Sequence, residues 1–558
     1  MYYKALCPTR CSLAGIIWHA ICVNSSFAGI ILVPGWPDGV IACLFIVLKN
    51  LKLWNTLLLI IMMLFYLILA CLFTVYDVDI GVLLIGSICA RISDHKRKNV
   101  QAAEHVDVEQ GIPHITAGMG KKTKKDPLPP KMKRSTSHIR VGNTNIPKVL
   151  VQLPMYNEEE HCDIIIKKCC EIEWPKERLH IQVLDDSTKK HVRDKVDLCV
   201  AALFEQGYPV SLMRRENREG FKAGAMVEGL KKLPGYKYVA IFDCDFEPGK
   251  QFLKQTIRYL EADSDLGFVQ TRWTFGNVSS FLTWCQKVSL DFHFCVEHRA
   301  RSHMGAFFNF NGTAGVWRIN CIEDSGGWQS DTVVEDMDLS LRAYLHGWKF
   351  LYVHDIECVN ELPSTFKAYR TQQFRWLAGP MQIFRKSLVT IFTARDVSFA
   401  KKLSCYVFFL RYIIFALITV AILAIPPIQT FVFPWTWSWA NYYFIVAVNV
   451  TAVLYLYITP FSIVYLLFAV AIGYFKTIAM VAGALNLKSS KGWSVTNKFG
   501  KKKQVKSLDK PYLLESILLM YYAGFAVYMF ISTQWYMAGY FGVMAMAFVI
   551  SAFGDILL

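Results

Sequence analysis

The sequence predicts an α/β domain of the Rossmann type, inserted between two α-helical membrane regions. Short apolar runs at residues 148–154 and 180–186 flank an amphipathic helix, and a third apolar run spans residues 238–245. Strands that alternate with helices are typical of βαβ units and a largely parallel sheet. A nearly uninterrupted apolar stretch lies upstream at residues 53–76, and more follow residue 400. About 20 apolar residues are enough for a helix to cross a bilayer.

Composition and charge agree with this organisation. The 558 residues are 54% apolar, which leaves room for one sizeable soluble domain and several membrane spans. The net charge is +16, and the stretches at 91–148 and 488–510 carry fifteen of these charges. Basic loops beside apolar spans are typical of the cytosolic side, so we expect no nucleic-acid partner. The sixteen cysteines contain no CxxC pair at zinc spacing, and we expect reduced thiols.

The predicted order of regions follows from these shifts in composition. We expect an N-terminal membrane region at 1–90, a basic flexible cytosolic linker at 91–145, the α/β domain at 146–395 and a C-terminal membrane region at 396–558. The first thirty residues lack the features of a cleavable signal peptide.

Several apolar segments are candidates for membrane spans. In the N-terminal region, residues 27–47 are a weaker candidate than 53–76, and residues 80–90 are too short to cross unaided. The C-terminal region predicts spans at 403–425, 440–466 with a kink at Pro460, 512–531 and 535–556. The segment at 467–487 either crosses or lies along the interface. If it lies along the interface, the basic stretch at 488–510 returns to the cytosolic side.

Acidic residues follow two of the predicted strands. Asp185-Asp186 ends one strand, and Asp243-Cys244-Asp245 ends another. Open α/β sheets bind ligands at the carboxyl ends of their strands, and hard carboxylate oxygens suit Mg²⁺ or Mn²⁺ shared with a diphosphate. Between these strands, the small residues around Lys222 allow close backbone approach, and its ammonium suits a phosphate. Each motif alone is also typical of a solvated turn.

Two predicted helices carry further polar groups. Glu335 and Asp336 open a helix that we expect to end at Gly347, so both carboxylates lie in its first turn, where the helix dipole favours negative charge. In the next helix, Gln372, Arg375 and Trp376 are spaced to lie on one face. A guanidinium binds phosphate, and an indole stacks on sugar C–H groups.

In this order and spacing, the motifs resemble the processive family 2 glycosyltransferases with a GT-A fold, the cellulose-synthase superfamily, over residues 148–510. QVLDDST, NREGFKAGA, FNGTAGVWR, VEDMDL and GWKFLY are similar to the plant and algal cellulose-synthase-like A and C subfamilies. The A type makes mannan or glucomannan from GDP-mannose, and the C type makes the glucan backbone of xyloglucan from UDP-glucose. QLPMYNEEE and residues 214–218 favour A, whereas GPMQIF resembles C. Phe374 stands where these plant subfamilies usually have His, and Val334 stands where the wider superfamily often has Thr.

The resemblance implies an inverting transfer of a hexose to the 4-hydroxyl of a growing β-glycan. Asp336 would be the general base, with Glu335 and Asp186 in the same catalytic group. Asp243 and Asp245 would hold Mg²⁺ or Mn²⁺. The remaining expected substrate contacts are Asp185 and Asp186 at the nucleoside, Lys222, Arg375 and Lys498 at the diphosphate, and Trp376 at the acceptor. Gln372 is a further expected substrate contact. Lys498 lies in WSVTNK, which resembles the gating loop of the superfamily.

The expected partners are a nucleotide sugar, the growing β-glycan and membrane lipid. The sequence leaves open whether the protein forms a homo-oligomer and whether it acts with an accessory glycosyltransferase. The resemblance implies a multi-pass protein of the Golgi membrane with a cytosolic catalytic domain, and the plasma membrane is the alternative. Two rival functions also stay open: a channel or transporter with a regulatory nucleotide-binding domain, and a single-transfer enzyme acting on a lipid phosphate.

Overall fold

The structure is a computed structural model that describes residues 64, 67–72, 74–96, 146–427, 430, 450–490 and 512–554. The chain divides into two compact units, each described here by itself. The α/β unit comprises Asp79–Ile413 and Ile478–Asp509 with Leu558, and the helical unit comprises Met1–Val78, Ile414–Thr477 and Lys510–Leu557.

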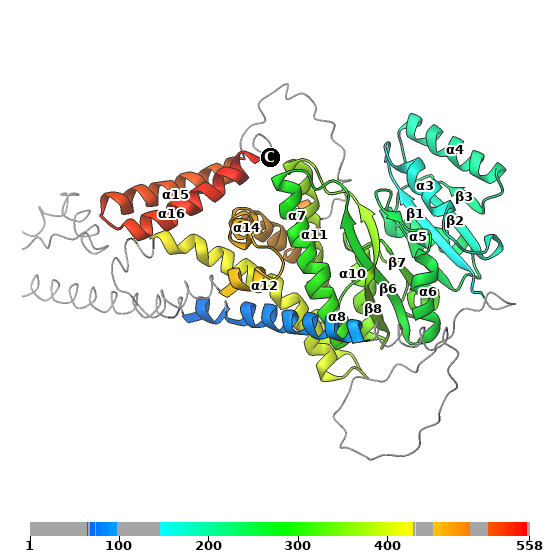
Figure 1. The fold of residues 1–558 in the computed structure, drawn as a ribbon, viewed down its shortest axis with the longest axis horizontal. Coiled ribbons are helices and arrows are strands. Elements are labelled where there is room, and N and C mark those ends of the chain that lie inside the picture. The colour runs from blue at the N-terminus through cyan, green and yellow to red at the C-terminus, as the bar shows by residue number, and fades with distance from the viewer. Residues whose placement is uncertain are drawn as a thin grey trace, which may run out of the picture. The chain divides into compact units, whose positions relative to one another are not determined.

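The α/β unit is built on one eight-stranded sheet with the strand order β3-β2-β1-β4-β7-β6-β8-β5 (Figure 1). The strands β3, β2, β1 and β4 are parallel, β7 runs antiparallel to both of its neighbours, and β6 pairs with β8 in parallel. The strands are β1 Val149–Met155, β2 Leu179–Asp185, β3 Val210–Met213, β4 Tyr238–Ile241, β5 Glu247–Pro248, β6 Leu266–Phe275, β7 Gly315–Arg318 and β8 Lys349–Asn360.

The predicted α/β fold with β1, β2 and β4 is confirmed. Every residue of β1 is buried, as expected for a strand covered by helices on both faces. β4 is shorter than the predicted run to residue 245, because the chain turns after Ile241. The remaining strands were not predicted, and among them β6 contributes Trp273 to the site described below.

Helices cover both faces of the parallel half of the sheet. α3 (Cys162–Cys170) and α4 (Lys190–Glu205) connect β1, β2 and β3 in one direction, and α5 (Phe221–Lys232) returns the chain to β4. Right-handed crossovers therefore place α3 and α4 on one face and α5 on the other. Buried Gln152 and Gln182 pair on neighbouring strands and donate to carbonyls of α5. A Cβ on Gly229 would overlap both amides, so glycine allows α5 to pack closely on the sheet.

The other helices of the α/β unit connect and border the antiparallel half. They are α6 Phe252–Ala262, α7 Phe281–Asp291, the π-helical turn η2 Phe292–His298, α8 Arg299–Met304, α9 Ile319–Asp324, α10 Glu335–Leu345 and α11 Phe366–Thr393. Short 3-10 turns occur at Lys176–Arg178 (η1) and Lys488–Ser490 (η4). The predicted helices after Val334 and after Ser364 are confirmed. Gly347 adopts φ +96° just past the end of α10, a conformation that favours glycine.

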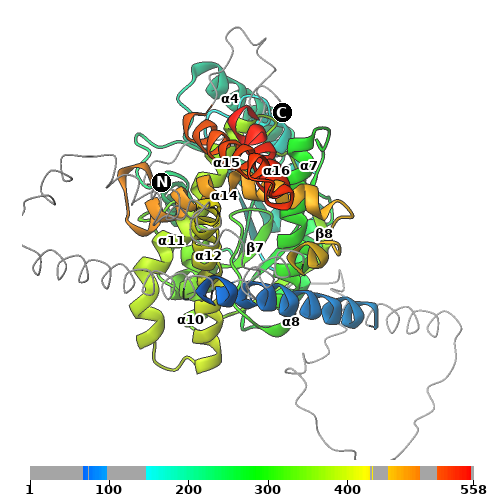
Figure 2. The ribbon, with the colours of Figure 1, turned by 90° about the vertical axis from the view of Figure 1, so that its left-hand side faces the viewer.

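Four described helices are long and apolar enough to cross a membrane: Leu67–Lys96, α12 Phe399–Pro427, α14 Ser462–Ala484 and α15 Leu513–Ile531. α16 (Trp535–Ala552) is shorter and apolar, and it lies beside α15 in both views (Figures 1 and 2). Buried aromatic residues, including Tyr522 and Phe548, form the core of the helical unit. The predicted spans at 403–425, 512–531 and 535–556 therefore correspond to helices.

Three predicted segments differ from the structure. Residues 80–90 are part of the long helix Leu67–Lys96, because their apolar run continues that of residues 67–79 without a proline. Pro460 does not kink a span at 440–466. It lies in a turn before α14, whose 23 residues include most of 467–487 and are long enough to cross. Residues 91–96 of the linker predicted at 91–145 belong to the helix Leu67–Lys96 and not to a flexible segment. Residues 97–145, the candidate span at 27–47, most of 53–76 and residues 431–449 lie outside the described residues, and the domain boundaries stay predictions.

Candidate active site

A cleft opens at the carboxyl ends of β1, β2 and β4, where an open α/β sheet is expected to bind its ligand. Its lining joins segments that lie far apart in the sequence. The predicted site residues that line it are Asp186, Lys222, Asp243, Asp245, Glu335, Asp336, Gln372, Arg375 and Trp376. Asp185 does not line it, and Lys498 lies outside the described residues.

Asp243 and Asp245 face the cleft from the turn after β4. The backbone N–H of Asp243 donates to Thr313 Oγ1 at 2.9 Å, and its carbonyl accepts from Phe246 N at 3.0 Å. Cys244, between the two aspartates, is buried in the core. The turn therefore brings both carboxylates to the cleft, as the position at a strand end predicted.

Lys222 connects this turn to the neighbouring cleft wall. It lies in the first turn of α5, and its Nζ lies 2.6 Å from Asp243 Oδ1 and 2.8 Å from the carbonyl oxygen of Gly312. Burial would lower the pKa of Lys222, but the carboxylates of Asp243, Glu335 and Asp336 outweigh burial and raise it. The ammonium therefore stays charged at the floor of the cleft.

Glu335 and Asp336 project from the first turn of α10. Asp336 Oδ1 accepts a hydrogen bond from its neighbour Met337 N at 2.8 Å. Gly312 adopts φ +78°, and a Cβ there would lie 3.0 Å from Asp336 Oδ2, so glycine gives this carboxylate room. Burial, followed by the negative charge of Glu335, raises the pKa of Asp336 to about 7. Burial also raises the pKa of Glu335, although Lys222 and Arg375 oppose this shift. Asp336 can therefore take up a proton near neutral pH.

The QQFRW helix α11 forms the opposite wall. Thr365 caps its start, accepting from Ala368 N, and Gln372, Arg375 and Trp376 all face the cleft, as their spacing predicted. The ring centroids of Trp376 and Trp273 are 6.4 Å apart. A Cβ on Gly379 would overlap the side chain of Val334, so glycine lets α11 pack against the residue before Glu335.

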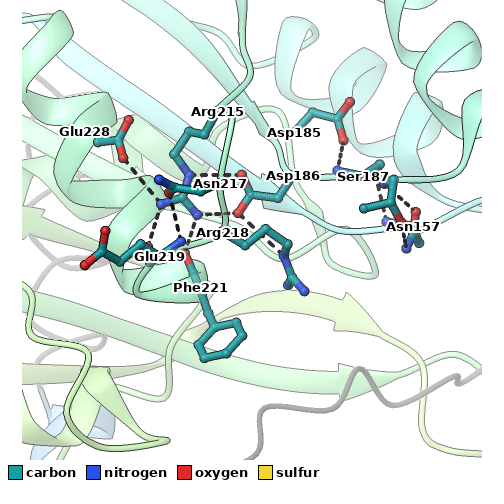
Figure 3. A network of polar contacts seen from close by, with 11 residues as sticks. Asn157, Asp185, Asp186, Ser187, Arg215, Asn217, Arg218, Glu219, Phe221 and Glu228 are labelled. Carbon is teal, nitrogen blue, oxygen red and sulfur yellow. Dashed lines mark hydrogen bonds and ion pairs between the residues drawn. The ribbon is translucent and has the colours of Figure 1, made fainter.

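The Asp185-Asp186 pair is bound by arginines, and Figure 3 shows those at Asp186, Arg215 and Arg218. Asp185 is buried, and its carboxylate accepts from Ser187 N at 3.0 Å and from Arg214 Nε at 2.9 Å. The structure therefore does not bring Asp185 to the expected nucleoside position. Strand alternation explains this result, because successive side chains of β2 point to opposite sides.

Asp186 reaches the cleft wall, but both of its oxygens accept from one guanidinium. Arg215 Nε lies 3.0 Å from Asp186 Oδ1, and Arg215 also pairs with Oδ2. The same guanidinium donates to the carbonyls of Glu219 and Phe221 at 2.8 and 2.9 Å. Asp186 thus holds the turn from which α5 and Lys222 begin, rather than presenting a free carboxylate.

Some lining residues were not assigned from the sequence. The guanidinium carbon of Arg218 lies 3.3 Å from the ring centre of Tyr156, and both residues line the cleft. Asn311 also lines it, one residue before Gly312. Tyr156, Arg218 and Asn311 lie in the motifs QLPMYNEEE, NREGFKAGA and FNGTAGVWR, which supported the resemblance, so motif membership could have indicated them. Trp273 could not be found this way, because β6 was not predicted.

The protein would supply only some of the ligands of a bound metal ion. Among the described residues, no group of three or more His, Cys, Asp or Glu side chains is placed to hold an ion. Asp243 and Asp245, however, line the same cleft. One or two carboxylates plus substrate phosphates are a common ligand set for Mg²⁺, so this pair fits an ion bound together with a diphosphate.

Known proteins share this sequence pattern. The chain matches the family described as Glycosyl transferase family 2 over residues 151–320 and Glycosyl transferase family group 2 over residues 238–476. It is 40% identical to the probable glucomannan 4-beta-mannosyltransferase 3 of Arabidopsis thaliana over 67% of this chain and 68% of that protein. It is 39% identical to glucomannan 4-beta-mannosyltransferase 1 of Oryza sativa subsp. japonica over 71% of this chain and 78% of the relative.

One solved structure can be compared with this chain. The mannosyltransferase PcManGT from Pyrobaculum calidifontis, in complex with GDP-Man and Mn²⁺, is 17% identical. The TM-score is 0.46, and the match covers 74% of this chain and 98% of that chain.

The sheet topology and the matched families define a family 2 glycosyltransferase with a GT-A fold. The protein is therefore an enzyme. The identity to curated relatives then narrows the class: the chain belongs to the glucomannan 4-beta-mannosyltransferases, the cellulose-synthase-like A branch of the cellulose-synthase superfamily.

Proposed function

We propose that this protein is a membrane-embedded mannan or glucomannan synthase that transfers mannose from GDP-mannose to the 4-hydroxyl of a growing β-glycan. One observation carries the proposal. Asp336, a carboxylate whose pKa is raised to about 7, lines the same cleft as the cationic Lys222 and the aromatic Trp376. A base, a phosphate-binding cation and a sugar-stacking surface are the groups that this transfer needs.

In the proposed step, Asp336 accepts the proton of the acceptor hydroxyl. The acceptor oxygen forms a bond to the anomeric carbon, the bond from that carbon to the phosphate oxygen breaks, and the electron pair leaves with GDP. Attack from the face opposite the leaving group inverts the anomeric centre. Glu335 supports this role, because its negative charge helps to raise the pKa of Asp336.

The leaving diphosphate would be stabilised by cations in the cleft. Lys222 and Arg375 line the site where the diphosphate would lie, and Lys498 is a predicted further contact. Asp243 and Asp245 would hold Mg²⁺ or Mn²⁺, which when bound neutralises charge on the diphosphate. Trp376 would stack on the terminal sugar of the acceptor, and Gln372 would bind one of its hydroxyls.

The test is polymer formation by membranes that contain this protein alone, supplied with radiolabelled GDP-mannose or UDP-glucose and Mg²⁺ or Mn²⁺. We expect a β-mannanase-sensitive polymer from GDP-mannose, and loss of synthesis when EDTA is added. A glucanase-sensitive polymer from UDP-glucose, with none from GDP-mannose, would contradict the proposed donor. The matched control is the Asp336→Asn protein at equal expression.

The proposed location is the Golgi membrane, with the catalytic unit on the cytosolic side. The basic stretches at 91–148 and 488–510 support this orientation. Protease treatment of sealed Golgi vesicles should cleave the α/β unit without detergent. Cleavage only after the vesicles are opened would contradict the orientation.

A further inference from the structure

A polar cluster, in which Glu297 and His298 are buried and His293 is half-buried, lies behind the cleft wall at Asn311. The π-helical turn η2 contributes His293, Glu297 and His298 to this cluster. Because a π-helix pairs residue i with residue i+5, it brings the two histidines together, and their ring centroids are 4.1 Å apart. Such turns are rare in proteins, and those that occur are often found at functional sites. No sequence pattern indicated this turn, and the predicted site did not include it.

The cluster holds the side-chain amide of Asn311. Asn309 Nδ2 donates to the carbonyl of Phe310 at 2.8 Å, and the same nitrogen lies 3.2 Å from Asn311 Oδ1, which identifies this oxygen as the acceptor. His293 Nε2 also lies 3.2 Å from Asn311 Oδ1 and therefore donates to it. His298 Nε2 lies 3.2 Å from Asn311 Nδ2.

The other ring nitrogen of His293 faces a fixed negative charge. His293 Nδ1 lies 3.1 Å from Glu297 Oε2, and Glu297 is buried. Glu297 also pairs with Arg411 and lies 3.4 Å from Arg301 Nε. Burial would raise the pKa of Glu297, but Arg411, His293 and Arg301 hold it well below its usual range. Both ring nitrogens of His293 therefore face oxygen acceptors, and both donate, which requires the doubly protonated ring.

Asn311 is linked to the reacting groups through the next residue. The carbonyl of Gly312 accepts from Lys222 Nζ at 2.8 Å, and a Cβ on Gly312 would lie 3.0 Å from Asp336 Oδ2. The backbone N–H of Asn311 donates to Gln270 Oε1 at 2.9 Å. The orientation of Asn311 therefore affects where the Gly312 carbonyl places the ammonium of Lys222.

We propose that His293, oriented by Glu297, is a positioning residue of the transfer reaction. It fixes the Asn311 amide in the cleft wall and, through the Asn311-Gly312 peptide, holds Lys222 and Asp336 in their working geometry. The proposal rests on the proposed function. His293 acts through Asn311 and does not touch the substrate.

Two substitutions separate the two contacts of the ring. His293→Gln places an amide nitrogen near the position of Nε2 and keeps a donor for Asn311, whereas His293→Asn places one near Nδ1 and keeps a donor for Glu297. We expect His293→Asn to lower kcat for polymer formation about tenfold, the loss of roughly one hydrogen bond, with KM for GDP-mannose unchanged. His293→Gln should stay within about threefold of the wild type. The melting temperatures of the two purified variants should be similar, because each loses one contact.

A double-mutant cycle then tests whether His293 acts through Asn311. Added to Asn311→Ser, the His293→Asn change should lower kcat less than about twofold further, because its target is already gone. Equal losses in the Asn and Gln variants, losses that follow melting temperature, or independent effects in the cycle would overturn the proposal. An inactive wild type would instead overturn the proposed function, so the two failures are distinguishable.

Discussion

Two acidic pairs lie at the same edge of the sheet and meet opposite environments. Asp185 and Asp186 end β2 beside Arg214 and Arg215, which bind both carboxylates. Glu335 and Asp336 begin α10, where burial raises both pKa values. The first pair is used to hold the chain in place, and the second keeps a carboxylate able to accept a proton. Residue type alone therefore does not distinguish a structural carboxylate from a reactive one. Direct hydrogen bonding to an arginine distinguishes them.

The largest effect should come from removing the proposed base. Asp336→Asn should lower polymer formation by about 1000-fold, because the acceptor proton then has no base, while GDP-mannose binding changes little. Radiolabel incorporation and equilibrium binding of the nucleotide sugar measure the two quantities. Asp265→Asn, which alters an exposed carboxylate paired with Lys349, should leave both unchanged. Wild-type synthesis in Asp336→Asn would remove this residue as the base.

A substitution in the Asp185-Asp186 pair should lower stability. Asp186→Asn should lower the free energy of unfolding by roughly 3 kcal/mol, because it leaves the buried Arg215 with only the exposed Glu228, 3.5 Å away, as a counter-charge. Thermal unfolding in detergent measures this loss as a lower melting temperature. Asp197→Asn is the matched control, since Asp197 is an exposed partner of Arg214 and such pairs contribute about 1 kcal/mol or less. Equal melting temperatures in the two variants would contradict a structural role for Asp186.

The acceptor surface should affect elongation selectively. Trp376→Ala should lower elongation about tenfold, the cost of one lost stacking contact, and should change hydrolysis of GDP-mannose much less. Comparing mannose incorporation with GDP release in the absence of acceptor separates the two reactions. If both reactions fall by the same factor, Trp376 supports the site generally and does not stack on the acceptor.

The smallest expected effect is a shift in pH dependence. Asp336 acts as a base only when it is ionised, so kcat/KM should fall as the pH drops below about 7. Glu335→Gln removes a neighbouring negative charge that raises the pKa of Asp336, and the acid limb should therefore move to lower pH. A pH series of initial rates for both proteins measures the shift. If the acid limb of the Glu335→Gln profile stays at the same pH or moves to higher pH, Glu335 does not set the protonation of Asp336.

Local patterns predicted much of the site. Spacing and composition predicted the helix starts at Glu335 and near Ser364, and they predicted the turn after β4. The structure has these features close to the predicted positions. Nine of the eleven predicted site residues line one cleft. Such predictions succeed because capping, side-chain periodicity and strand ends are properties of a few neighbouring residues.

The expectations that differ from the structure share a different cause. Asp185 was expected at the nucleoside, but the arginines that bind its carboxylate and that of Asp186 come from a segment about thirty residues later. Residues 80–90 were considered as a separate segment, too short to cross unaided, whereas the structure joins them to the preceding helix. Both outcomes depend on relations that a short window of sequence does not contain.

The sequence by itself determined the α/β class, the family and most of the charged groups of the cleft. Only the tertiary structure decided which carboxylates are neutralised by cations, which glycines allow close approach, and that a π-helical turn places His293 behind Asn311. The physical reason is that pKa values and hydrogen bonds depend on distances between side chains, and folding sets those distances between residues far apart in the chain.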